Sequence, residues 1–180
     1  YLLFLINDLI GSTIKFNIDQ ALLSKPSYID SNFYISLPTN IKSLDIELYN
    51  KYKLEIESDS ISYFPLQLIK AFTSEDNLSC FITKINYDGN LLHSLDSSYF
   101  NALQYNFSTK NVVLGEFNYN GFDVIQYIIT TPEIVRIKLF IINLSNYYQI
   151  DYIIPYHLYR KNINSIESSI GSLNKEIDTR

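Results

Sequence analysis

Residues 112–154 read VVLGEFNYNGFDVIQYIITTPEIVRIKLFIINLSNYYQIDYII. Alternating apolar and polar residues, interrupted by short turn signals, predict four consecutive strands that pair as antiparallel hairpins. Asn120-Gly121 is the clearest turn signal, because a type I′ turn needs positive φ at both central residues. Thr131-Pro132 and Ser145-Asn146 are turn signals of similar length. The predicted strands are Val112–Tyr119, Phe122–Thr130, Glu133–Leu144 and Tyr147–Ile154.

The two faces of this predicted meander differ, because two-residue turns fix the register and the register assigns each side chain to a face. The predicted core face is almost wholly apolar and carries Val113, Gly115, Phe117, Tyr119, Phe122, Val124, Gln126, Ile128, Val135, Ile137, Leu139, Ile141, Tyr148, Ile150, Tyr152 and Ile154. The other face mixes charged, aromatic and aliphatic residues, so we expect another part of the chain or a partner to cover it in part.

The composition is that of an ordinary folded domain with a sizeable core. The chain has 180 residues, of which 47% are hydrophobic and 18% charged, and these values exclude a disordered chain. The formal net charge of −5 argues against nucleic acid as a main partner, because phosphate binding needs a basic surface. The single cysteine, Cys80, lies in an apolar, strand-like run, so we expect a buried, inert thiol and no disulfide.

The chain begins with the apolar run YLLFLI, far shorter than the ~20 residues of a membrane-spanning helix. The start at Tyr1 and the absence of Met predict a mature or trimmed chain, in which residues 1–10 are the remnant of a targeting segment or a first structural element. We expect no membrane span. Peripheral membrane association, and an extracytoplasmic or organellar location, would fit these features.

Outside the meander, three segments have apolar residues at helical spacing, namely Ile41–Glu57, Leu95–Phe107 and Asn162–Ile177. Ser43 is the expected N-cap of the first helix, and Ser94 or Asp96 that of the second. Strands are expected at Asn32–Leu37, Pro65–Phe72 and Leu78–Tyr87, with Thr13–Ile18 as a short strand or arm and Asp19–Asp30 as a connection.

This order of elements predicts an α+β fold, in which an antiparallel sheet with a C-terminal four-strand meander is flanked by helices. We expect residues 32–180 to form one domain and residues 1–31 to be an N-terminal extension or arm. The last helix should dock on the sheet through its stripe of Ile163, Ile166, Ile170 and Leu173. Gly171 lies within that helix and marks either a close-packing point or the true helix end.

Three features carry a family resemblance: Phe33-Tyr34-Ile35-Ser36-Leu37-Pro38 before the first helix, the long meander, and the closing run INSIESSIGSL at 163–173. Over about residues 32–173 the chain resembles the PsbP-like/DcrB-like superfamily, which holds the PsbP proteins of photosystem II, bacterial DcrB-like lipoproteins and a Ran-binding nuclear import factor. It departs from that pattern near Ile41, where an aromatic residue, often Trp, is expected. The resemblance implies a PsbP-like fold and a role as accessory subunit, adaptor or chaperone-like binder, with no shared catalytic motif.

The residues offer little support for enzyme chemistry, and we expect no catalytic residues, no cofactor and no metal site. His93 and His157 show no metal-ligand spacing, and no nucleophile elbow or glycine-rich phosphate loop occurs. The unusual feature is a set of charges at mid-strand positions among aromatic and aliphatic residues. The predicted partner-binding residues are Tyr127, Arg136, Lys138, Tyr147 and Asp151.

Two alternatives remain open for this surface. The charges are either ordinary strand charges on a partly solvent-exposed face, or they orient a protein partner that is held by the aromatic side chains. The first or second helix, or the 13–18 arm, would in the first case cover the face and leave only its rim exposed. The sequence thus predicts a non-catalytic binding or accessory protein, a subunit of a larger protein assembly. The alternative function is a chaperone or adaptor that binds an apolar segment of a client protein.

Overall fold

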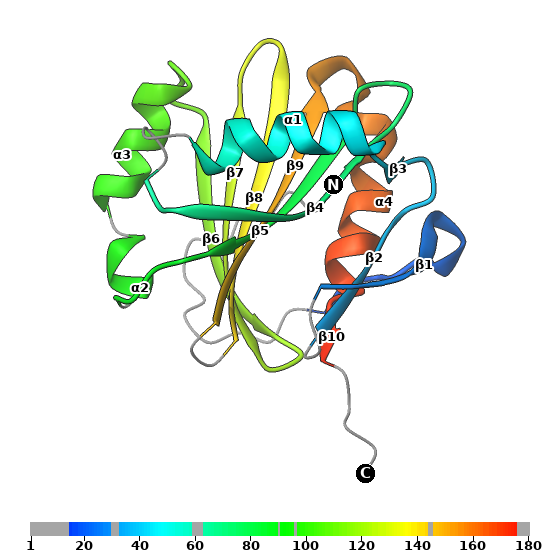
Figure 1. Cartoon of the computed structure of the whole chain (residues 1–180), viewed down its shortest axis with the longest axis horizontal. Coiled ribbons are helices and arrows are strands. Elements are labelled where there is room, and N and C mark those ends of the chain that lie inside the picture. The colour runs from blue at the N-terminus through cyan, green and yellow to red at the C-terminus, as the bar shows by residue number, and fades with distance from the viewer. Residues whose placement is uncertain are drawn as a thin grey trace.

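The computed structural model describes residues 15–29, 33–58, 63–89, 91–95, 97–143 and 146–175 (Figure 1). The strands are β1 (Leu23–Tyr28), β2 (Phe33–Pro38), β3 (Lys42–Ser43), β4 (Leu66–Thr73), β5 (Ser79–Ile85), β6 (Val112–Tyr119), β7 (Phe122–Thr130), β8 (Ile134–Asn143), β9 (Asn146–Pro155) and β10 (Asn174–Lys175). The helices are η1 (Gln20–Leu22), α1 (Ile46–Glu57), α2 (Leu91–Ser94), α3 (Ser97–Asn106), η2 (Tyr156–Leu158) and α4 (Tyr159–Gly171).

A seven-stranded antiparallel sheet organises the molecule, with the strand order β3-β4-β5-β9-β8-β7-β6. The predicted meander forms β6 to β9, and the β6–β7 hairpin has the predicted register. The β7–β8 and β8–β9 pairings are shifted by two residues from the prediction, with Thr130 opposite Val135 and Asn143 opposite Asn146, and this even shift keeps the predicted faces. Asn120 and Gly121 have φ values of 49° and 77°, as a type I′ turn requires. The predicted hairpin of β4 and β5 joins the meander where β5 pairs with β9. The predicted α+β class and sheet are therefore confirmed.

One face of the large sheet packs against α4 and a small sheet with the order β1-β2-β10. This is the predicted core face, and Leu139 at its centre is 1% exposed. Strand β2 contributes Phe33, Ile35 and Leu37, and α4 contributes Ile166 and Ile170. Helix α4 also bonds to β2 through the Ser169 hydroxyl, which donates to the carbonyl of Ser36 at 2.6 Å. The expected docking of the last helix on the sheet is confirmed.

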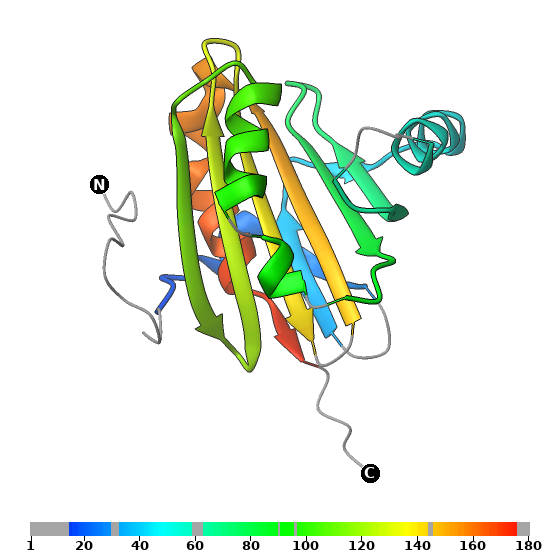
Figure 2. The ribbon, with the colours of Figure 1, turned by 90° about the vertical axis from the view of Figure 1, so that its left-hand side faces the viewer.

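The opposite face carries a second apolar cluster beneath α2 and α3, and Figure 2 shows α3 and α4 on opposite sides of the sheet. Tyr99 and Leu103 of α3 are buried there against Tyr127 and Phe140. Helix α1 lies over the other end of the same face, where its Tyr52 contacts Phe81 of β5. No helix among the described residues is long and apolar enough to cross a membrane.

Several predicted element boundaries were wrong, because short strands formed by distant pairing replace the ends of predicted helices and loops. Residues 19–30 were expected to be a connection, but they contain β1, which pairs with β2. The first helix begins at Ile46 with Asp45, not Ser43, as its N-cap, because Ser43 belongs to β3. The expected helix at 95–107 is α3, which spans Ser97–Asn106, and the short helix α2 before it was not predicted. Asp96 lies outside the described residues.

Helix α4 runs over Tyr159–Gly171 and not over the predicted Asn162–Ile177, and Asn174 and Lys175 pair with β2 as β10. Both alternatives for Gly171 hold. It ends the helix, and a Cβ there would lie 2.5 Å from Cβ of Phe16. Phe16 belongs to the arm Lys15–Ile18, whose predecessors at 1–14 lie outside the described residues. Their predicted role as an extension stays a prediction, whereas residues 23–28 are part of the small sheet.

Candidate functional site

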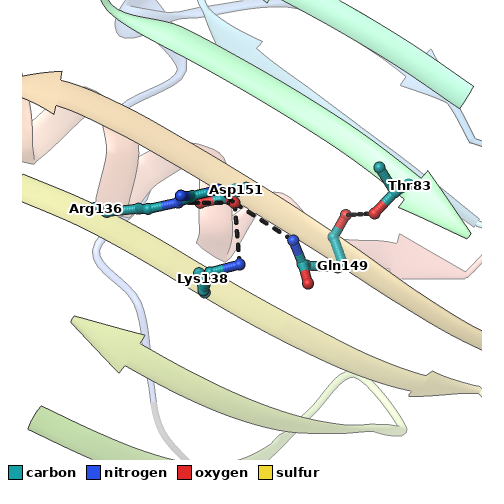
Figure 3. A network of polar contacts seen from close by, with 5 residues as sticks. All are labelled: Thr83, Arg136, Lys138, Gln149 and Asp151. Atoms are coloured by element: carbon teal, nitrogen blue, oxygen red, sulfur yellow. Dashed lines mark hydrogen bonds and ion pairs between the residues drawn. The ribbon is translucent and has the colours of Figure 1, made fainter. Parts of the chain in front are cut away.

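Three of the predicted partner-binding residues, Arg136, Lys138 and Asp151, meet at one buried carboxylate. Asp151 of β9 faces Lys138 of β8 directly across the strand pair, and Arg136 lies two residues earlier on β8. Arg136 Nε donates to Asp151 Oδ1 at 2.7 Å, and its Nη2 donates to Oδ2. Lys138 Nζ lies 3.2 Å from Oδ2, and Gln149 Nε2 donates to the same oxygen at 3.3 Å. Figure 3 shows these groups and Thr83, which bonds to the main chain of Gln149.

Burial and charge act against each other in this network. Burial alone would raise the pKa of Asp151, but Arg136 and Lys138 outweigh it and hold that pKa below its usual value. Burial lowers the pKa of Lys138 to about 8, although the attraction of Asp151 opposes this shift. The guanidinium of Arg136 lies 5.4 Å from the centre of the Phe107 ring, a cation–π contact that closes the network beside α3.

The structure therefore places most of the predicted contact surface inside the fold. Tyr127 is fully buried under α3, and its hydroxyl donates to the carbonyl of Leu95. Lys138 and Asp151 are inaccessible to a partner while α3 is in place. Arg136 and Tyr147 keep exposed atoms, and for these two the partner-binding role stays a prediction. The second helix covers this face, which was one of the two alternatives drawn from the sequence.

A different feature offers an accessible binding site, namely a cavity of about 470 Å³ between α4 and the core face of β7 and β8. This cavity is called the α4 groove below. Its apolar lining comprises Phe16, Ile128, Val135, Ile137, Ile163 and Ile170. Its polar and tyrosine lining comprises Gln126, Thr130, Tyr156, Tyr159, Arg160, Asn164 and Glu167. Its volume lies within the usual range of ligand pockets, roughly 300–1,000 Å³.

Helix periodicity explains how α4 serves the core and the groove at once. Ile166 and Ile170 are buried in the core, whereas Arg160, Asn164 and Glu167 follow one another at helical spacing along the groove. Tyr156 and Arg160 are exposed at the rim, so the groove is open to solvent. Burial raises the pKa of Glu167, a carboxylate beside an apolar floor. The predicted stripe of the last helix contained Ile163 and Ile170. The spacing of these residues in the sequence does not indicate that a cavity lies between this side of α4 and the sheet.

The groove and the network contain few of the groups that catalysis or metal binding requires. The groove lining includes Arg160 and Glu167 as charged residues. His157 is exposed, and the side chain of His93 lies outside the described atoms. Among the described residues, no group of three or more His, Cys, Asp and Glu side chains is placed to hold a metal ion. Cys80 is fully buried, as expected, and burial raises the pKa of its thiol.

The comparisons with known proteins identify the fold. No protein-family model and no curated protein matches the sequence. The solution structure of cyanobacterial PsbP (CyanoP) from Synechocystis sp. PCC 6803 matches with a TM-score of 0.53 and 12% identity, covering 93% of this chain and 99% of that one. The predicted resemblance is thus confirmed at the level of the fold, which is PsbP-like. A crystal structure from Bacteroides thetaiotaomicron VPI-5482 matches at 12% identity with a TM-score of 0.39, covering 85% of this chain and 49% of that one.

Proposed function

We propose that this protein is a non-catalytic binding protein that holds an apolar segment of a protein partner in the α4 groove. The observation that carries this proposal is the groove itself, a cavity of about 470 Å³ whose lining includes Ile128, Val135 and Ile137 and whose rim is exposed to solvent. Burying such surface is the main source of affinity for an apolar ligand. The polar rim of Arg160, Asn164 and Glu167 would orient the bound segment.

The arm Lys15–Ile18 supports a peptide as the occupant. Phe16 lines the groove, and its ring packs edge-on against Tyr119 at 4.8 Å and Phe117 at 6.0 Å. The main-chain N–H of Asp19 donates to Ser168 of α4 at 3.1 Å, which holds the arm against the helix. A non-helical segment with an aromatic side chain therefore already packs at one end of the groove. The remaining space suits a second apolar segment of similar build.

The test is the binding of a dansyl-labelled decapeptide of alternating Leu and Ser, compared with an all-Ser peptide of the same length. We expect the Leu-containing peptide to bind and Ile163→Glu to weaken that binding about tenfold or more, because the variant places a charge in the groove wall. Tyr105→Glu is the matched control, since Tyr105 is 85% exposed on α3 at the opposite face. Equal binding by Ile163→Glu, or no preference for the Leu-containing peptide, would refute the proposal.

An accessory subunit and a chaperone or adaptor would use the same groove but differ in how long the partner stays bound. A stoichiometric partner retained through purification from the native source indicates the accessory role. A partner that leaves after transfer to a second protein indicates the adaptor role. Ile163→Glu is again the matched control, because a groove-bound partner should be lost with that variant while Tyr105→Glu retains it.

A further inference from the structure

Strand β6 ends one side of the large sheet, and no strand of the described residues pairs with its outer edge. The strand is eight residues long, and its sequence VVLGEFNY contains neither Pro nor a basic residue. Val113 and Leu114 lie on opposite faces of this edge, with 45% and 37% of their surface exposed. Natural edge strands are usually protected by charge, proline, bulges or shortness. Apart from the exposed Glu116, this long edge has none of these protections, because it contains no proline and no bulge, and it therefore has the properties of a pairing surface.

The register of the β6–β7 hairpin identifies the backbone groups that face outward. In a two-residue hairpin the residues flanking the turn, here Tyr119 and Phe122, form a hydrogen-bonded pair, and such pairs recur at every second residue. The N–H of Thr130 donates to the carbonyl of Asn111 at 2.9 Å, which agrees with this phase at the other end. The outward N–H and C=O groups therefore belong to Val112, Leu114, Glu116 and Asn118.

We propose that β6 pairs antiparallel with β6 of a second copy of this chain, about a two-fold axis at Gly115. The outward N–H and C=O groups of the two copies can bond only if even-numbered residues of one copy face even-numbered residues of the other. In any such register the two-fold axis passes through a residue and not between two residues. An axis at Glu116 would set two carboxylates directly opposite each other, which is unfavourable. An axis at Leu114 would pair only 112–116 within the strand. An axis at Gly115 pairs 112–118 and sets Leu114 beside the second copy's Glu116.

This register also covers the exposed apolar residues of the edge. Val113 lies on the core face and would face the second copy's Phe117 across the new junction, whereas Leu114 would be covered on the other face. Gly115 lies opposite Gln126, a residue of the α4 groove. It has no side chain that would hold the large sheets of the two copies apart on that face. The two grooves would then open toward each other on one side of a continuous sheet. That last consequence rests on the proposed function, but the pairing does not.

Gly115→Cys tests the axis directly. At the axis the two Gly115 residues form a non-hydrogen-bonded pair with Cα atoms about 4.5 Å apart, within the range that a disulfide spans. A side chain fits there, because a Cβ on Gly115 would lie 3.7 Å from Gln126 Oε1. Cys80 is the only native cysteine and is fully buried, so it should not compete for oxidation. We expect rapid formation of a disulfide-linked dimer under mild oxidation, read on non-reducing gels.

Val113→Cys is the matched control, because it lies on the same face but is four residues, or about 13 Å, from its counterpart in the proposed register. It should therefore remain largely monomeric under the same oxidation. Equal cross-linking of the two variants, or none for Gly115→Cys, would overturn the proposed axis.

Sedimentation velocity of the full chain supplies the second measurement. The unmodified protein should show a concentration-dependent dimer, and Leu114→Pro should abolish it, because proline removes an outward N–H without touching the β6–β7 pairing. Leu114→Val keeps that N–H and should retain the dimer. A protein that stays monomeric at every concentration would overturn the proposal, whereas loss of peptide binding in a dimeric protein would overturn only the proposed function.

Discussion

Lys138 of β8 and Asp151 of β9 are directly paired residues whose buried side chains meet with Nζ 3.2 Å from Oδ2. Arg136 binds the same carboxylate, so one buried anion pairs with two cations. Buried ion pairs of this kind contribute little net stability, but breaking one leaves an uncompensated charge in a region of low polarity. The roles of the three charges are therefore unequal, and the carboxylate is the critical member.

Asp151→Asn should lower the free energy of unfolding by about 3–5 kcal/mol, because it leaves the buried Lys138 and the partly buried Arg136 without an anion. Lys138→Met is the matched control. It removes one buried cation but leaves Asp151 bonded to Arg136, so stability should change by less than about 1 kcal/mol. Urea unfolding near neutral pH measures both. An Asp151→Asn protein as stable as Lys138→Met would show that the carboxylate is not the anchor of the network.

The low pKa of Lys138, about 8 against an ordinary 10.5, predicts a specific pH dependence. Between these values the unfolded chain binds a proton that the folded chain lacks, so the free energy of unfolding should rise with pH by up to ~1.4 kcal/mol per unit. Burial raises the pKa of Cys80 above its ordinary 9.0, and this effect opposes the rise at higher pH. The stability of the wild type minus that of Lys138→Met, measured from pH 7 to 10, isolates the lysine. A difference that stays flat, or falls, would contradict the prediction.

Leu139→Ala should cost about 2–5 kcal/mol, because Leu139 is 1% exposed and its deletion leaves a cavity between the sheet and the layer of α4 and β2. Val113→Ala is the control on the same face. Val113 is 45% exposed, and its truncation should change stability by about 0.5 kcal/mol or less. Thermal and urea unfolding of the two variants, at concentrations where sedimentation velocity shows only the monomer, give the comparison. Similar losses in both would contradict the assigned faces.

Gly171→Ala should destabilise the domain by about 1–3 kcal/mol, because the added methyl group would meet Phe16 Cβ and force the arm away from α4. Hydrogen exchange at residues 15–19 should accelerate in this variant. At Gly115 a Cβ would make only an ordinary contact with Gln126, so Gly115→Ala should be neutral or slightly stabilising. An unchanged rate of hydrogen exchange at residues 15–19 in Gly171→Ala would show that the added methyl group fits without moving the arm.

The candidate site was only partly predictable from the sequence. The charged residues Arg136, Lys138 and Asp151 were correctly placed together on one face, because side chains alternate along a strand and the two-residue shift of the β8–β9 register keeps that face. Their burial was not predictable, because nothing in the period of Leu95–Phe107 specifies which face of the sheet that segment covers. The α4 groove was not predicted at all. It lies between α4 and strands β7 and β8, and a space between two packed layers is a property of the tertiary structure.

The sequence by itself determined the meander, its Asn120-Gly121 turn and the two faces of its strands. The physical reason is that strand period and the positive φ of Asn120 and Gly121 are local properties, which act within a few residues. Only the tertiary structure decided the short strands β1, β3 and β10 and the end of α4. Each of these depends on a partner far along the chain, such as Lys175 pairing with Phe33. Local sequence patterns do not specify such distant partners. The burial of the charged residues under α3 also depends on packing between segments that are far apart in the sequence.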